Sequence, residues 1–445
     1  MRISTNQLYD AGVRGMERNQ TQMLKLQEQI SSGRRILTPA DDPIGAARAL
    51  TVTQTREVAA QHARNQGAAA DRLGLVDSRL AAVTELLQSV RDRVIQAGNT
   101  VLSDSDRRAV ASELEARFEE LLGIANSQNA EGDYLFAGHQ GATTPFVLSA
   151  ATSSAAPASV SYFGDNGERL MQVGPTQQMA SSVAGSDLFM NIREGNGSFV
   201  TAAGGGGGGT LANQGAGVID GGSVLDPQKW QRALNSDFWQ GSSNQVLEIR
   251  FSAVAGVSHY QLFDVSTAVS PDPALPARPV SDLLPFTAGQ AIPLSASVAP
   301  VTDFGAQVVI NGLPADGDSF SVTPSANKSV FATMQELIGL LRSPLGSSEA
   351  RTEFTGKLAG HLINLDQAQA NVGRLQASVG ARLQALDGLS SSSTAVDILY
   401  EQSLSDLQDL DYAKALSDFT RQQMSLEAAQ RSFVTISGLS LFSYL

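Results

Sequence analysis

Apolar residues recur at seven-residue intervals near both ends of the chain. Toward the C-terminus, two such series run three positions apart: Tyr412, Phe419, Leu426 and Phe433, and Ala415, Gln422, Ala429 and Ile436. The N-terminal series is Tyr9, Met16, Met23 and Ile30. Residues that repeat every seven positions share one side of a helix, which a partner helix can cover. We therefore predict that helices at about 5–32 and 396–445 pack together.

Two longer helices are predicted between these ends. The first starts at Pro43, because Asp42 suits the N-cap and proline suits the first helical position. It continues to about residue 97, and its seven-residue series is Leu73, Leu80, Leu87 and Val94. The second runs from about 348 to 389, with the series Leu358, Leu365, Val372, Val379 and Leu386. We expect these two helices to be partners.

Shorter helices are predicted beside the long ones. Ser103 with Asp106 resembles a capping box, which predicts a helix that ends near residue 127. Another helix is expected from about 329 until Pro344 stops it. The run Ser390–Thr394 is interpreted as a linker or a local loosening before the C-terminal helix.

The middle of the chain has a different composition. Thirteen of the sixteen prolines and both tryptophans, Trp230 and Trp239, fall in 141–330, which therefore reads as strands and loops. Segments 161–163 and 169–173 flank a glycine-rich turn and predict a hairpin, and further strands are expected at 246–251, 261–265 and 306–310. Whether the run Gly204–Gly209 is ordered stays open.

The predicted fold class is α+β and multidomain. It is an elongated rod of long, coiled-coil-like helices from both chain ends, with an inserted β-rich head. We predict a terminal helical assembly domain from 1–45 and 396–445, a helical bundle rod from 46–140 and 329–395, and a head from 141–328 that forms one or two subdomains.

Charge and composition narrow the functional classes. A net charge of −13 argues against nucleic-acid binding, and the absence of cysteine excludes disulfides and thiolate catalysis. No apolar run approaches the roughly 20 residues of a membrane helix, and the N-terminus lacks the apolar core of a cleavable signal peptide. Residues 1–35 carry six basic and three acidic groups, whereas 397–411 carry five acids and no base. We expect this opposition to help the two ends pair.

Candidate chemistry is sparse. The four histidines lie far apart, and His361 falls on a coiled-coil face. The glycine run lacks the ending of a phosphate loop, and Asp316 with Asp318 predicts a β-turn rather than a calcium loop. We predict no catalytic, cofactor-binding or metal site, and no enzyme activity.

Several motifs resemble one family. Residues 29–43, Gln-Ile-Ser-Ser-Gly-Arg-Arg-Ile-Leu-Thr-Pro-Ala-Asp-Asp-Pro, resemble the N-terminal signature of flagellins and their relatives, and the Asp-Asp-Pro ending resembles the hook–filament junction branch. Residues 409–415, 426–430 and 440–445 are similar to the C-terminal part of the same family. So are 131–138 and 311–318.

The resemblance implies an extracellular structural protein of the bacterial flagellum. It would form a layer of copies of itself between the first hook-associated protein and flagellin. It would be exported unfolded without a cleaved signal peptide, and an export chaperone would guard its C-terminal helix. A filament subunit similar to flagellin, or an adhesin that binds glycans through its head, are the alternatives.

Assembly is the expected mechanism. We predict an interface made of the two seams, with other apolar side chains open for neighbouring subunits. Its residues are Tyr9, Met16, Met23, Ile30, Leu404, Leu407, Leu410, Tyr412, Phe419, Leu426, Phe433 and Ile436.

Overall fold

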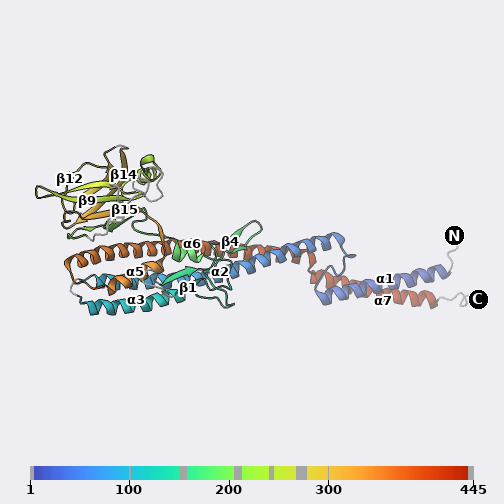
Figure 1. Ribbon diagram of the computed structural model, residues 1–445. Coiled ribbons are helices and arrows are strands. Elements are labelled where there is room, and N and C mark those ends of the chain that lie inside the picture. Colours follow the sequence, from blue (N-terminus) through green and yellow to red (C-terminus); the bar gives the residue numbers. More distant parts are fainter. Residues whose placement is uncertain are drawn as a thin grey trace, which may run out of the picture. The chain divides into compact units, whose positions relative to one another are not determined.

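The computed structural model describes residues 5–99, 102–149, 158–204, 213–239, 245–266, 278–298 and 300–438 (Figure 1). The chain forms two compact units. The first comprises Met1–Ala68, Gln172–Gln178 and Leu386–Leu445, and the second comprises Ala69–Met171 and Met179–Ala385. The helices from both chain ends and the β-rich region inserted between them confirm the predicted α+β class.

The first unit contains α1 (Thr5–Ser32) and α7 (Tyr412–Gly438), which lie side by side (Figure 1). The pair is antiparallel, because Gly12 approaches Phe433 at one end and Gly33 approaches Tyr412 at the other. The predicted pairing of the two chain ends is therefore confirmed for Tyr412–Gly438, whereas residues 396–408 belong to a different helix, α6 (Ser348–Gln408). The same unit contains the start of α2 (Pro43–Ala97) and the end of α6 (Ser348–Gln408).

A short backbone contact joins the two places where these helices end. Gly33, at a φ of +73°, follows α1, and its carbonyl accepts a hydrogen bond from the Leu410 N–H at 3.0 Å. The Arg35 N–H donates to the Gln408 carbonyl at 2.7 Å. Glycine adopts this left-handed conformation without a Cβ clash. The connector after α1 is thus fastened to the break between α6 and α7.

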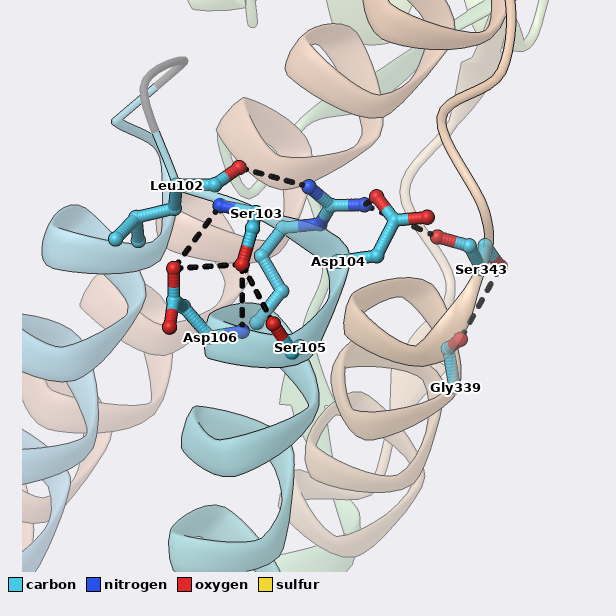
Figure 2. Close-up of polar contacts among 8 residues, drawn as sticks. Leu102, Ser103, Asp104, Ser105, Asp106, Gly339 and Ser343 are labelled. Atoms are coloured by element: carbon cyan, nitrogen blue, oxygen red, sulfur yellow. Dashed lines mark hydrogen bonds and ion pairs between the residues drawn. The ribbon is translucent and has the colours of Figure 1, made fainter.

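The helical part of the second unit is built from α2, α3 (Asp104–Ala125), α5 (Val330–Arg342) and α6. The side chains of the two predicted long series face the core. Those that are 5% exposed or less are Leu73, Leu80, Leu87, Val94, Leu358, Leu365, Val372, Val379 and Leu386. At one end of α3, Ser103 and Asp106 form the predicted capping box, drawn in Figure 2. Phe118 of α3 meets Phe331 of α5 edge to face, with ring centroids 6.0 Å apart.

The linker predicted at Ser390–Thr394 is wrong, because α6 is continuous from Ser348 to Gln408. Hydroxyl groups that would favour a break are bonded within the helix or to a neighbouring side chain. The Thr394 Oγ1 donates to the Ser390 carbonyl at 3.0 Å, and Ser393 hydrogen bonds with Gln66. Such bonds let serine and threonine remain in a helix interior.

The predicted hairpin around residues 164–167 is also wrong. Its two segments do form strands, but β2 (Ser159–Tyr162) pairs with β1 (Phe146–Ser149), and β3 (Leu170–Gln172) pairs with β4 (Gln178–Ala180). The Asp165 carboxylate accepts hydrogen bonds from the N–H groups of His139 and Gly167. The intervening turn is therefore held against residues 138–139, which prevents the two strands from pairing with each other.

The β-rich region contains two antiparallel sheets around one apolar core (Figure 1). The larger sheet has the order β11-β10-β9-β15-β6, with β12 beside β10. Its strands are β6 (Phe199–Ala203), β9 (Leu247–Val254), β10 (Val257–Asp264), β11 (Arg278–Pro279), β12 (Leu284–Pro285) and β15 (Ser319–Pro324). The smaller sheet contains β7 (Val218–Ile219), β8 (Ser223–Val224), β13 (Ala291–Ala296) and β14 (Thr302–Asn311).

Shorter elements complete this region. They are η1 (Ser186–Met190), β5 (Ile192–Arg193), α4 (Pro227–Leu234), η2 (Asp237–Trp239) and β16 (Asn327–Lys328). The strands predicted at 246–251, 261–265 and 306–310 correspond to β9, β10 and β14. Residues 205–209 of the glycine run lie outside the described residues.

Candidate assembly surface

The α1–α7 pair buries little of its apolar surface. The predicted residues Met16, Met23, Ile30, Phe419, Leu426 and Phe433 are half-buried, and Tyr412 is 51% exposed. The side chains of Tyr9 and Ile436 lie outside the described residues. Of the side chains described in these two helices, only Ala415 is fully buried. A pair that covers its seam so incompletely gains little stability from hydrophobic burial.

One polar position fixes how the two helices are aligned. The Gln422 Nε2 donates to the Oδ1 of Asn19 and to the Oε1 of Gln22, both at 3.1 Å. Gln422 occupies a position in the seven-residue series that would otherwise be apolar. A polar residue in such a seam favours one register over its alternatives at some loss of stability.

Helix α7 also carries large apolar side chains that are exposed and lie outside this seam. Leu416, Met424 and Val434 are 52%, 60% and 68% exposed. They fall outside the seven-residue series, so the sequence pattern does not distinguish them. Other large apolar side chains of the first unit are also exposed, namely Leu24, Ile44, Leu50, Val58, Ile398 and Leu399. Exposed apolar patches of this kind are typical of interaction surfaces.

Three leucines are less open than predicted. Leu404, Leu407 and Leu410 are half-buried, because the end of α6 lies against the connector that follows α1. The carbonyl of Leu407 also accepts a hydrogen bond from the Arg35 Nη2 at 2.7 Å. The more accessible apolar surface belongs to α7.

Within the described part of the chain, the acidic groups of 397–411 do not form the ion pairs with α1 that the charge pattern suggests. Arg56 of α2 forms an ion pair with Asp397 at 2.8 Å and also binds Glu401. Lys25 of α1 binds Asp41 instead of an acid from 397–411. Among the described residues, no ion pair joins α1 to 397–411. Two of the five acids, Asp397 and Glu401, are instead paired with the start of α2.

The two acids before α2 organise its beginning. The Asp42 Oδ1 accepts a hydrogen bond from the Gly45 N–H at 2.9 Å, and α2 starts at Pro43. That hydrogen bond, followed by the interaction with Arg35, lowers the pKa of Asp42. Lys25 and the backbone N–H of Thr38 lower the pKa of Asp41 to about 2. Both carboxylates therefore hold the connector in place.

His361, in the second unit, has a strongly shifted pKa. Burial lowers the pKa of His361 to about 4, and its Nδ1 lies 3.9 Å from Glu336. A cavity of about 240 Å³ beside it is lined by Lys328, Lys357 and parts of β6, β7 and α6. Its two lysines are ion-paired, Lys328 with Glu336 and Lys357 with Glu353. Groups of three or more metal-ligating side chains are absent from the described residues.

Two other functional classes find little support in the described parts of the chain. Both tryptophans are 2% exposed and belong to the β-region core, so they do not form a sugar-binding face. No helix among the described residues combines the length and apolar character needed to cross a membrane.

This chain is similar in sequence to known flagellar proteins. Residues 3–141 match the bacterial flagellin N-terminal helical region. The chain is 23% identical to the flagellar hook-associated protein 3 of Escherichia coli over 99% of both chains. It is 32% identical to that of Salmonella typhimurium over 43% of this chain and 58% of the other.

Solved structures agree with the sequence comparisons. The crystal structure of flagellar hook associated protein-3 from Legionella pneumophila matches with a TM-score of 0.67 and 26% identity, over 80% of this chain and 98% of that one. A structure of FlgL from Xanthomonas campestris matches with a TM-score of 0.63 and 26% identity, over 80% of this chain and 99% of that one.

The chain is similar to flagellar proteins in its paired helices from both chain ends, its inserted β-rich region and its flagellin-type N-terminal region. The similarity to flagellar hook-associated protein 3 extends over 99% of the chain, and the similarity to the flagellar junction protein FlgL from Legionella pneumophila extends over 81% of it.

Proposed function

We propose that this chain is a structural subunit of the bacterial flagellum that joins the hook-associated region to the flagellin filament. Its full-length similarity to hook-associated protein 3 supports this function. The observation that carries the proposal is the exposed apolar surface of α7 at Leu416 and Met424. This surface lies on a helix pair in which Ala415 is the only fully buried residue among the described side chains. Such a surface gains stability when a neighbouring subunit covers it.

The assembly mechanism follows from the kind of contact. Unlike surfaces that meet repeatedly with the same rotation and rise produce an open helical array. The terminal domain, 1–45 and 396–445, makes these contacts in our proposal. The terminal domain carries the rod, 46–140 and 329–395, and the head, 141–328. The predicted seam residues pair within one subunit, and the exposed residues of α7 contact the next.

The proposed partners follow from the position of such a layer. Copies of this chain contact one another, hook-associated protein 1 lies on the hook side, and flagellin lies on the filament side. Before export, a chaperone covers the C-terminal helix, whose apolar surface would otherwise promote aggregation. The assembled protein is extracellular, as part of the flagellum. A structural role of this kind requires no cofactor and no enzyme activity.

The experiment introduces a charge into the exposed surface of α7. A strain that lacks this protein is complemented with the double variant Leu416→Asp and Met424→Asp. Because these side chains are exposed, the monomer keeps its helical content, while burial of two carboxylates at a subunit contact is unfavourable. We expect hooks without filaments, and flagellin in the culture medium.

The matched control is Leu283→Asp in the β-rich region, where the leucine is 44% exposed compared with 52% for Leu416. It should restore attached filaments. Circular dichroism of the purified variants checks that all of them fold. Normal numbers of filaments in the α7 double variant would show that this surface is not the assembly interface.

A further inference from the structure

The chain contains three asparagines that are followed by glycine: Asn166, Asn196 and Asn311. In such a pair, the backbone nitrogen of the glycine can attack the side-chain amide carbon of the asparagine. Glycine favours this reaction because it has no Cβ to hinder the approach and its backbone is flexible. The reaction needs both groups to be free to move, so the fold decides which of the three pairs can react.

The Asn196–Gly197 pair is held on both sides. The Asn196 Nδ2 donates to the carbonyls of Gly221 and Gly222, at 3.0 and 3.3 Å. Its Oδ1 accepts from the backbone N–H groups of the two residues after Gly197, both at 2.9 Å. The Gly197 N–H donates to the Glu194 carbonyl at 3.2 Å. Several hydrogen bonds must therefore open before the nitrogen can reach the amide carbon.

The Asn166–Gly167 pair is held on one side. The side chain of Asn166 is exposed, but the Gly167 N–H donates to the Asp165 Oδ1 at 2.7 Å. This bond fixes the attacking nitrogen. The adjacent negative charge also disfavours loss of the N–H proton, which the attack requires.

The third pair lacks both of these hydrogen bonds, although the backbone of Asn311 pairs with Val218 of β7. Asn311 is the last residue of β14, and both Asn311 and Gly312 are exposed. Within the described part of the chain, neither the Asn311 side chain nor the Gly312 N–H forms a hydrogen bond. Gly312 has a φ of +83°, which confirms that the turn depends on glycine.

We propose that Asn311–Gly312 is a site of spontaneous deamidation. The Gly312 nitrogen loses its proton and forms a bond to the Asn311 Cγ, the bond between Cγ and Nδ2 breaks, and ammonia leaves with that proton. Water then opens the resulting succinimide ring. The product is aspartate, or isoaspartate when the other ring bond opens. No reactant other than water is required.

Either product changes the turn between β14 and β15. A carboxylate replaces a neutral amide five residues before Asp316 and seven residues before Asp318 in the sequence. The buried Asp318 carboxylate anchors this turn by accepting hydrogen bonds from the N–H groups of Gln214, Gly215 and Ala315. Isoaspartate also lengthens the backbone by one methylene before that anchor. Aged protein would therefore differ from new protein in the charge and geometry of the head.

The test follows the mass of the peptides that contain each pair. The full-length protein is incubated in neutral and in mildly alkaline buffer, digested and analysed by mass spectrometry. We expect the peptide with Asn311 to gain one mass unit, faster at the higher pH. The peptide with Asn196 should react more slowly by about tenfold or more, because hydrogen bonds must open first.

Two comparisons make the result decisive. In urea the three pairs should react at similar rates, which assigns the difference to the fold. The variant Asn311→Gln should remove the product at this site, because its longer side chain closes a ring less readily. The proposal is wrong if Asn311 stays intact in the folded chain but reacts in urea, or if Asn196 reacts as fast in the folded chain. The readout is chemical, so it is independent of flagellar assembly.

Discussion

At the residue scale, Gly12 marks a close approach between α1 and α7. A Cβ placed there would lie 3.0 Å from the Phe433 Cδ2, whereas a Cβ at Gly15 would meet nothing within 4 Å. We therefore expect Gly12→Leu to separate the two helices. Gly15→Leu should instead lower the free energy of the helical state of α1 by about 0.5–1 kcal/mol, because glycine is a poor helix former.

Hydrogen exchange of α1 and α7 in the two variants provides the measurement. Faster exchange is expected for Gly12→Leu, and unchanged or slower exchange for Gly15→Leu. Equal behaviour of the two variants would mean that Gly12 does not determine the distance between the helices.

Asp41 provides a prediction about pH at the same scale. Lys25, 2.5 Å away, is the main cause that lowers the pKa of Asp41 from 3.8 to about 2. Since the folded pKa is the lower one, ionised Asp41 stabilises the connector above its unfolded pKa. This contribution is lost as the pH falls toward 2. A carboxyl titration followed by NMR should give a midpoint near 2.

Removal of the lysine tests the cause. Lys25→Met should move the midpoint upward, but not fully to 3.8, because the N–H groups of Leu37 and Thr38 still bind the carboxylate. Lys414→Met on α7 serves as the control and should leave the midpoint unchanged. An unchanged midpoint in Lys25→Met would exclude the ion pair as the cause.

At the scale of single elements, α3 depends on its N-terminal cap. The Ser103 Oγ accepts a hydrogen bond from the Asp106 N–H at 3.3 Å, and the Asp106 Oδ2 accepts from the Ser103 N–H at 3.1 Å (Figure 2). Ser103→Ala should lower the free energy of unfolding by about 1 kcal/mol, as measured by urea denaturation. Ser112→Ala, at an exposed interior position of α3, should leave it the same or slightly raise it.

The elements differ in how far the sequence could predict them. The capping box and the seven-residue series could be predicted from the sequence, because each depends on residues within a few positions of one another. The actual partners of β2 and β3, which are β1 and β4, were not predictable, because the Asp165 carboxylate binds the N–H of His139, which is distant in sequence. The break predicted at the serine run is absent, because its hydroxyls form hydrogen bonds that the local sequence does not reveal. One of these joins Ser393 to Gln66, more than 300 residues away in sequence.

The exposed apolar residues of α7 could be predicted from the sequence only in part. Periodicity predicted which residues of α7 face α1, since that depends on the helical repeat alone. It did not identify Leu416, Met424 or Val434, because an apolar residue outside a repeat carries no sequence signal that distinguishes exposure from burial. The ion pair between Arg56 and Asp397 also required the fold, since the two residues lie on different helices.

At the scale of the whole molecule, the two units differ in how their helices are stabilised. In the second unit, α3 buries Leu114, Phe118 and Leu121 in a continuous core. In the first, the pair α1 and α7 fully buries only Ala415 among its described side chains. Helices that bury so little open locally at a smaller cost in free energy than helices of a buried core.

Hydrogen exchange on the free, full-length protein should therefore separate the two units. Backbone amides of α1 and α7 should exchange faster than those of α3 by about a hundredfold or more, because local opening costs little where few apolar contacts are lost. In the proposed assembly neighbouring subunits cover Leu416, so the same amides should become protected in protein incorporated into flagella. Protection of α1 and α7 equal to that of α3 in the free protein would mean that the terminal pair is stable alone, and that assembly is not what orders it.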